Sequence, residues 1–274
     1  MRLDLRGFWP VRRLGSLRGA VVTPARPLIA VSQSIGESAH SFLAEPMGEL
    51  SWSGPISVNY IGMSNVDDRW NANGADRTGD YSGALIVAIF GDFSIGTFAP
   101  DSPEGVNELQ YLDYYAQLAE AKGCQLMLIS PPHTPPGAPD TWDMETMSKT
   151  ITKAAWLNAR PGRTIRTAVI PMPILARRLV EYYAPASIFR DGLHMNWREP
   201  GMAAMRGMGL LIHATLTGAR YAGPLSDAED GVMADMAWEV ARDYACTGLG
   251  GSIVIPPWPM AGDPLPDPAP LPAD

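Results

Sequence analysis

The chain has little of several features that would place it in a class at once. Only two cysteines, Cys124 and Cys246, occur in 274 residues, and their spacing fits neither a disulfide scaffold nor a cysteine metal site. No apolar run reaches the roughly 18 residues that span a bilayer. The N-terminus lacks the pattern of a secretory signal peptide. We therefore expect no membrane span, and either the cytoplasm or an assembled particle as the location.

Charge is also scarce, and it is unevenly placed. Charged residues make up 18% of the chain and the net charge is -8, which disfavours nucleic acid as a general partner. Hydrophobic residues make up 46%, which predicts a globular core. Residues 1–27 nevertheless carry six arginines against one acidic residue, Asp4. This basic arm either docks on an acidic surface or forms an irregular, solvated lead-in.

Short apolar runs alternate with helical patterns along the rest of the chain. Five runs have the length and composition of strands, at residues 28–32, 56–61, 84–90, 125–129 and 164–170. Three longer stretches have apolar residues at helical spacing, at residues 106–122, 144–155 and 202–217. This alternation predicts an α/β domain with a mainly parallel sheet.

The same pattern divides the chain into four parts. After the basic arm we expect the α/β domain over residues 28–217 and a helical extension over residues 218–250. Residues 251–274 hold eight of the 26 prolines, so an extended tail is predicted there, either exposed or laid along a partner protein.

Polar residues follow the predicted strands, where the ligand crevice of a parallel sheet lies. Ser34 follows the first strand at a strand-to-helix turn, and its hydroxyl and backbone N–H can face a substrate. Gly62 follows the second strand and permits close approach of its N–H. Asp191 precedes His194 by three residues, a spacing that lets the carboxylate orient an imidazole. A serine, a histidine and an aspartate suffice for nucleophilic catalysis.

Each of these residues also has a simpler interpretation. Ser34 is equally suited to cap the helix that follows, with Ser38 as a competing nucleophile, and His194 to cap a helix that begins near Pro200. Asp191 and Gly62 fit ordinary turns. Other polar residues are interpreted as loop or structural residues rather than as ligands: His40, His133, His213, Asp67, Asp68 and Asp92. The alternative for His133, which follows the fourth predicted strand, is that it lines the pocket.

In this order the segments resemble the SGNH (GDSL-type) hydrolase superfamily over roughly residues 28–217. Residues 28–36 resemble the Gln-Ser form of its first motif, found in carbohydrate O-acetylesterases and in SGNH-like domains of phage proteins. Residues 59–62 resemble the second motif, and residues 191–201 match the fifth. The resemblance implies a three-layer α/β/α flavodoxin-like sandwich with a mainly parallel sheet of about five strands.

The resemblance also implies roles. Ser34 is the nucleophile, His194 the general base and acid, and Asp191 its orienting partner, while the N–H groups of Ser34 and Gly62 bind the oxyanion. One departure matters, because Phe93 stands where the third motif has an asparagine that donates to the oxyanion. Losing such a donor costs about 10²–10³ in rate. Ser94, or Asn65 from the loop after the second strand, is the candidate replacement.

Two functions follow from these residues. The first is a serine ester hydrolase that removes O-acyl (acetyl) groups from carbohydrate without a cofactor or a metal. The alternative is a catalytically weak or inactive structural or receptor-binding component of a phage-like particle (virion), with residues 1–27 and 251–274 contacting other structural proteins. A flavodoxin-like cofactor binder is disfavoured, because no Gly-rich phosphate loop follows residues 28–32.

Overall fold

The architecture comes from a computed structural model of the chain. It describes residues 28–32, 56–60, 65–72, 85–88, 94–130, 142–183, 202–223, 228–260 and 265.

The fold is built around one parallel sheet. Its strands are β1 (Leu28–Ser32), β2 (Ile56–Tyr60), β3 (Leu85–Ala88), β4 (Gln125–Ile129) and β5 (Ala168–Ile170). They lie in the order β2-β1-β3-β4-β5, and every neighbouring pair is parallel. Together with the helices between the strands, this sheet confirms the predicted α/β class.

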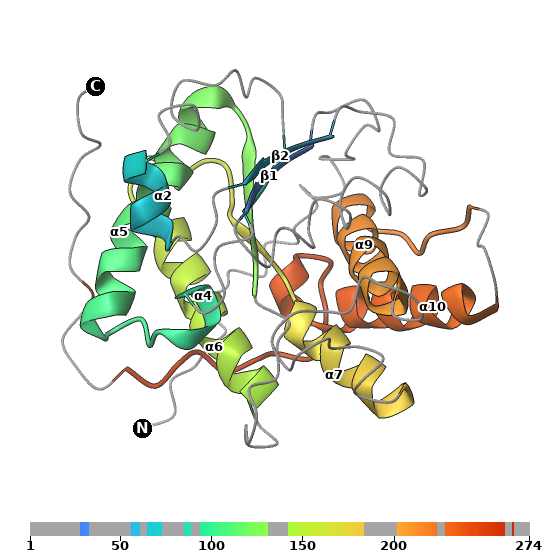
Figure 1. The fold of residues 1–274 in the computed structure, drawn as a ribbon. Coiled ribbons are helices and arrows are strands. Elements are labelled where there is room, and N and C mark those ends of the chain that lie inside the picture. The colour runs from blue at the N-terminus through green and yellow to red at the C-terminus, as the bar shows by residue number, and fades with distance from the viewer. Residues whose placement is uncertain are drawn as a thin grey trace.

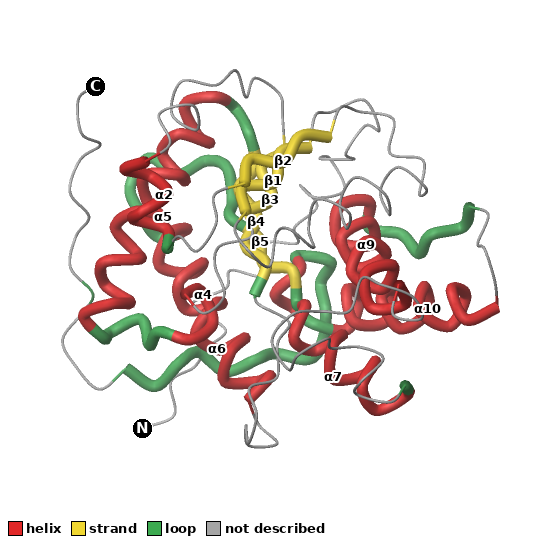
Figure 2. Tube along the Cα trace, in the orientation of Figure 1, coloured by secondary structure: helices red, strands yellow, loops and turns green. Residues whose placement is uncertain are grey.

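Helices lie on either side of the strands. They are α2 (Val66–Ala72), α4 (Ser94–Thr97), α5 (Pro103–Lys122), α6 (Trp142–Asn158), α7 (Met172–Tyr182), α9 (Met202–Thr217) and α10 (Ala228–Asp243), with a short 3-10 turn η2 (Ala245–Thr247). Figure 1 shows α2, α5 and α6 to the left of the strands and α7, α9 and α10 to the right. Figure 2 shows the strands as one column between these two groups of helices.

The helix α5 shows how local sequence sets the ends of an element. Its predicted start at Val106 is wrong by three residues, because the Ser102 hydroxyl accepts a hydrogen bond from Gly105 N (3.0 Å) and so caps a helix that begins at Pro103. At the other end Gly123 adopts a left-handed φ of 68° and its N–H donates to Ala119 O and Glu120 O. Four apolar residues expected on the inner face are buried: Leu109, Leu112, Ala116 and Ala119.

Gly105 gives a prediction about this helix start. A Cβ at residue 105 would lie 1.9 Å from Ala99 O, which is backbone and cannot move aside. Gly105→Ala should therefore lower the free energy of unfolding by about 1–3 kcal/mol, the usual cost of overpacking, although alanine favours helix. Urea unfolding measures this change. Gly207→Ala is the control, because the three atoms nearest its Cβ would all belong to leucine side chains, the closest at 3.1 Å. It should cost far less.

The strand β5 is shorter than predicted, since it begins at Ala168 rather than Thr164. The reason is competition for backbone groups. The Glu120 carboxylate accepts hydrogen bonds from Thr164 N (3.0 Å) and Ile165 N (2.9 Å), and the Asn158 side chain accepts one from Thr167 N (2.8 Å). These amides are therefore bonded to side chains of α5 and α6 instead of to a neighbouring strand.

The core joins the C-terminal helices to the sheet. Buried side chains of β4 and β5 belong to one cluster with those of α5, α6, α7, α9 and α10. The helices expected from the sequence do not include α7, which Pro171 precedes and which contains Pro173. Proline is tolerated in the first helical turn, where its missing N–H has no partner to lose. Ile174, Leu175 and Leu179 of α7 are accordingly buried.

The C-terminal segment, residues 251–260, returns across the molecule. Ile253 N donates to Asp243 O (2.8 Å), and Ala245 N donates to Ile253 O (3.1 Å), which anchors its start beside the end of α10. Further along, Trp258 N donates to Thr152 Oγ1 of α6 (2.8 Å). Figure 1 shows the segment passing below α6. It therefore links the last helix of the fold to α6.

Candidate functional site

Most of the site expected from the sequence lies outside the described residues. Ser34, Gly62, Asp191 and His194 all fall there, as do other polar or aromatic candidates: Ser38, His40, Asp92, Phe93 and His133. Ser94 is described, and it is the first residue of α4.

The strand order determines which chain segments leave the sheet side by side. β1 lies between β2 and β3 and is parallel to both, so the carboxyl ends of these three strands share one edge. The connections also change direction here, since the chain moves from β1 outward to β2 and then back past β1 to β3. In open parallel sheets, ligands bind at the carboxyl edge where this reversal occurs.

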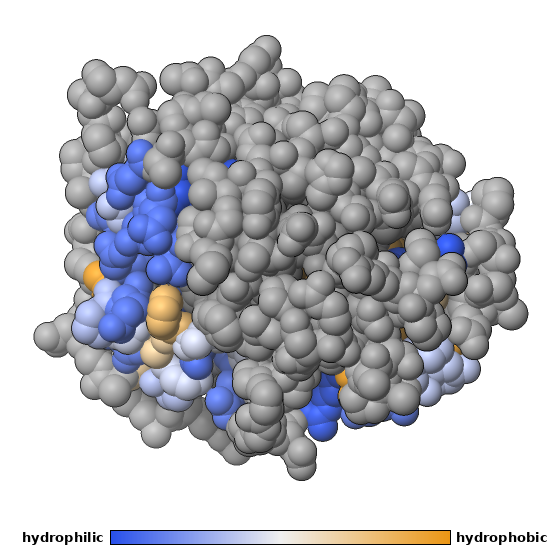
Figure 3. Space-filling view, viewed as in Figure 1, coloured by the Kyte–Doolittle hydropathy of each residue, from blue (hydrophilic) through white to orange (hydrophobic). Residues whose placement is uncertain are grey.

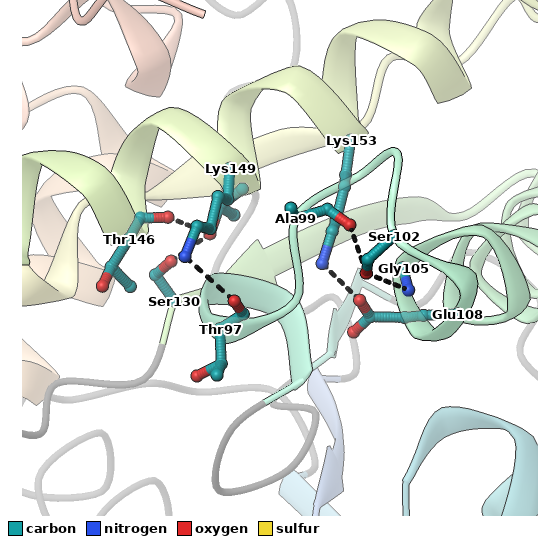
Figure 4. A network of polar contacts seen from close by, with 10 residues as sticks. Thr97, Ala99, Ser102, Gly105, Glu108, Ser130, Thr146, Lys149 and Lys153 are labelled. Carbon is teal, nitrogen blue, oxygen red and sulfur yellow. Dashed lines mark hydrogen bonds and ion pairs between the residues drawn. The ribbon is translucent and has the colours of Figure 1, made fainter. Parts of the chain in front are cut away.

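A polar cluster, which we call the edge cluster, is formed at this carboxyl edge by Thr97, Ser130, Lys149 and Thr150. Figure 4 shows Thr97, Ser130 and Lys149 of this cluster. Ser130 directly follows β4, and its hydroxyl bonds to that of Thr150 on α6; both residues are fully buried. Since the Thr150 hydroxyl donates to Thr146 O (2.9 Å), its single proton is committed, and Ser130 is the donor between the two.

Lys149, which directly precedes Thr150 on α6, contacts a different element, the helix α4. Lys149 Nζ donates to Thr97 O, the last residue of α4, at 2.9 Å. Consecutive residues of α6 therefore hold the carboxyl end of β4 and the end of α4. This arrangement brings α4, and with it Ser94, to the same edge of the sheet as the reversal between β1 and β3.

A buried ion pair lies one turn further along α6. Lys153 Nζ contacts Glu108 Oε2 on α5, and the two side chains are 0% and 4% exposed (Figure 4). Burial lowers the pKa of Lys153, while the charge and hydrogen bond of Glu108 oppose the change. Because both side chains are enclosed, the pair is not accessible to a substrate. It joins α5 to α6 next to the edge cluster.

Sequence reasoning did not single out Lys149, Lys153 or Glu108. Lys153 lies between the buried residues Ile151 and Ala154 of α6, and Glu108 lies beside the buried Leu109. A charged residue within an apolar helical stripe is the signal that was present. It does not identify the partner, because 45 residues separate Glu108 from Lys153.

Asn65, the other candidate donor, directly precedes α2, and its backbone N–H is hydrogen-bonded there. Its N–H donates to Asp68 Oδ2 (3.3 Å), and Asp67 accepts a hydrogen bond from Asn107 of α5 (2.9 Å). In the described part of the chain, no three His, Cys, Asp or Glu residues gather as a metal site requires. Figure 3 shows the visible surface over α2 and α5 as largely hydrophilic, consistent with exposed Asn71 and Glu104.

His213 lies within α9, as the helical pattern of residues 202–217 indicates. Burial lowers its pKa, and its ring meets Tyr221 edge-on with centroids 5.3 Å apart. Burial and contact with an aromatic ring are both typical of a structural side chain, as we expect for His213 from the sequence.

No protein-family model and no curated protein matches this chain. The roles of its residues therefore rest on the sequence motifs and on the positions of the strands that precede them. Among the described helices, none is long and apolar enough to cross a membrane.

Proposed function

We propose that the chain is a serine ester hydrolase of the SGNH type, built on a three-layer, flavodoxin-like sandwich. Ser34 is the nucleophile, His194 the general base and acid, and Asp191 the residue that orients His194. The N–H groups of Ser34 and Gly62, with a donor from Ser94, bind the oxyanion. The substrate class is an O-acylated carbohydrate, with acetyl as the acyl group.

The observation that carries this proposal is the strand order. Ser34 comes two residues after the end of β1, and Gly62 two residues after the end of β2. Two residues of chain span at most about 7 Å, so the proposal puts both residues near the carboxyl edge. The third predicted donor, Ser94, opens the helix that follows β3. Three motifs far apart in sequence thus follow adjacent strands at the reversal point, where α/β sheets bind ligands.

These roles describe a complete reaction. Ser34 Oγ attacks the ester carbonyl carbon while His194 accepts the hydroxyl proton, and the oxyanion is bound by the N–H donors. The bond to the sugar oxygen then breaks, and His194 returns the proton to that oxygen. A water molecule, deprotonated in the same way, cleaves the acyl-serine and releases the carboxylic acid.

A second candidate is supported by Phe93, which offers no hydrogen bond at the third oxyanion position. A catalytically weak or inactive component of a phage-like particle would tolerate this residue. The C-terminal segment adds to this alternative, because Ile253, Val254 and Met260 are exposed apolar residues that a partner protein would cover.

Covalent labelling tests the first proposal. A fluorophosphonate should form one adduct, mapped by mass spectrometry to the peptide that contains Ser34, and the protein should hydrolyse 4-nitrophenyl acetate. Ser38→Ala serves as the matched control and should keep the adduct. A folded protein with neither adduct nor hydrolysis would refute the esterase proposal and favour the particle component.

A further inference from the structure

The helix α4 depends on outside contacts for its position. It has only four residues, Ser94–Thr97. Helices this short are not stable by themselves, because the conformational entropy lost in forming the first turn exceeds the stabilisation from its hydrogen bond. Its last carbonyl groups also have no partners within the helix. What holds α4 therefore decides where Ser94 lies.

One side chain supplies that contact from α6. The Lys149 ammonium donates to Thr97 O (2.9 Å) and so satisfies a carbonyl at the end of α4. It is also 4.6 Å from the centre of the Trp258 ring, a cation–π distance. Burial lowers the pKa of Lys149, and Glu145 opposes this change.

Trp258 is itself fixed from two directions. Its backbone N–H donates to Thr152 Oγ1 on α6 (2.8 Å). The segment that contains Trp258 is also anchored at Ile253, beside the end of α10. Ile255, between these two points, is buried. The ring is therefore held over Lys149, and it restricts the conformations that the lysine can adopt.

We propose that Lys149 is a positioning residue, which fixes α4 and thereby Ser94 at the carboxyl edge of the sheet, and that Trp258 makes the C-terminal segment part of this support. The inference rests on the proposed function in assigning Ser94 to the oxyanion. The contacts that hold α4 do not depend on it.

Loss of Lys149 should act on the transition state rather than on substrate binding. Lys149→Met keeps the aliphatic stem but removes the donor to Thr97 O. Since a displacement of about 1 Å can cost up to about a hundredfold in rate, kcat should fall by about ten- to a hundredfold with KM little changed. Lys149→Arg should restore most of kcat, because a guanidinium can donate to the carbonyl and stack on Trp258. Trp258→Ala should lower kcat by about two- to fivefold.

Hydrogen–deuterium exchange provides a readout that does not require activity. Exchange in the peptide covering residues 94–99 should accelerate in Lys149→Met, less in Trp258→Ala, and return towards the wild-type rate in Lys149→Arg. Arg166→Met is the matched control, because Arg166 donates to Asn158 O at the far end of α6 (2.8 Å). It should alter neither this peptide nor kcat.

The outcomes separate the two proposals. Unchanged exchange at residues 94–99 in Lys149→Met would overturn the positioning role, and so would faster exchange with kcat intact in an active protein. If the wild-type protein hydrolyses no ester and takes no fluorophosphonate, the esterase proposal fails, whereas the exchange rates still decide whether Lys149 holds α4.

Discussion

Ser34→Ala should lower kcat/KM for 4-nitrophenyl acetate by about 10⁴-fold or more, since removing the nucleophile of a serine hydrolase leaves only binding and oxyanion stabilisation. The measurement is a steady-state rate at pH 7–8, above the pKa of about 6.5 that an ordinary histidine has in solution. KM should change little, because the hydroxyl contributes little to binding of the ground state.

Controls make this result specific to Ser34. Ser38→Ala should retain the wild-type rate, because Ser38 lies four residues further along the chain and is not the proposed nucleophile. Circular dichroism should show that both variants fold. Equal rates for Ser34→Ala and the wild type would assign any observed hydrolysis to another group and would remove Ser34 from the mechanism.

The second large effect concerns stability. Glu108→Ala should lower the free energy of unfolding by about 3–5 kcal/mol, because it leaves the Lys153 ammonium buried without its counter-charge. The double variant Glu108→Leu with Lys153→Met should be far less destabilised, since replacing both charges with apolar groups leaves no buried ion. Urea unfolding of both variants measures the difference.

The loss should also depend on pH in a defined direction. The pKa of Lys153 in the folded protein lies below its ordinary value of 10.5. Between the two values the unfolded chain binds the extra proton, so stability increases as pH rises through this window. Glu108 is the group that raises the pKa, and its removal extends the window to lower pH. Glu108→Ala should therefore regain stability between pH 7 and pH 10 more than the wild type does.

An exposed ion pair provides the comparison. Arg220 Nε lies 2.5 Å from Asp235 Oδ1, and the two side chains are 37% and 61% exposed. Asp235→Ala should cost at most about 1 kcal/mol, because water screens the pair and solvates either partner left alone. If Glu108→Ala costs no more than Asp235→Ala, the buried pair contributes nothing beyond an ordinary surface contact.

Local sequence predicted the main elements because their signals are local. The apolar runs at residues 28–32 and 125–129 are confirmed as β1 and β4, and the helical spacing at residues 202–217 is confirmed as α9. The errors arise where a distant side chain or an unusual turn intervenes. Glu120 shortens β5 from 45 residues away, and α7 begins at Met172 with Pro171 before it and Pro173 in its first turn.

The same distinction between local signals and contacts with distant residues applies to the candidate site. The sequence by itself determined the motifs, their order along the chain and the alternation of strands and helices, since these depend on residue types and short spacings. Only the tertiary structure decided that β1 lies between β2 and β3, that Lys149 contacts both Thr97 of α4 and the Trp258 ring, and that Glu108 pairs with Lys153. The physical reason is that such pairings join residues tens of positions apart, whose encounter depends on how the elements pack and not on the residues beside them.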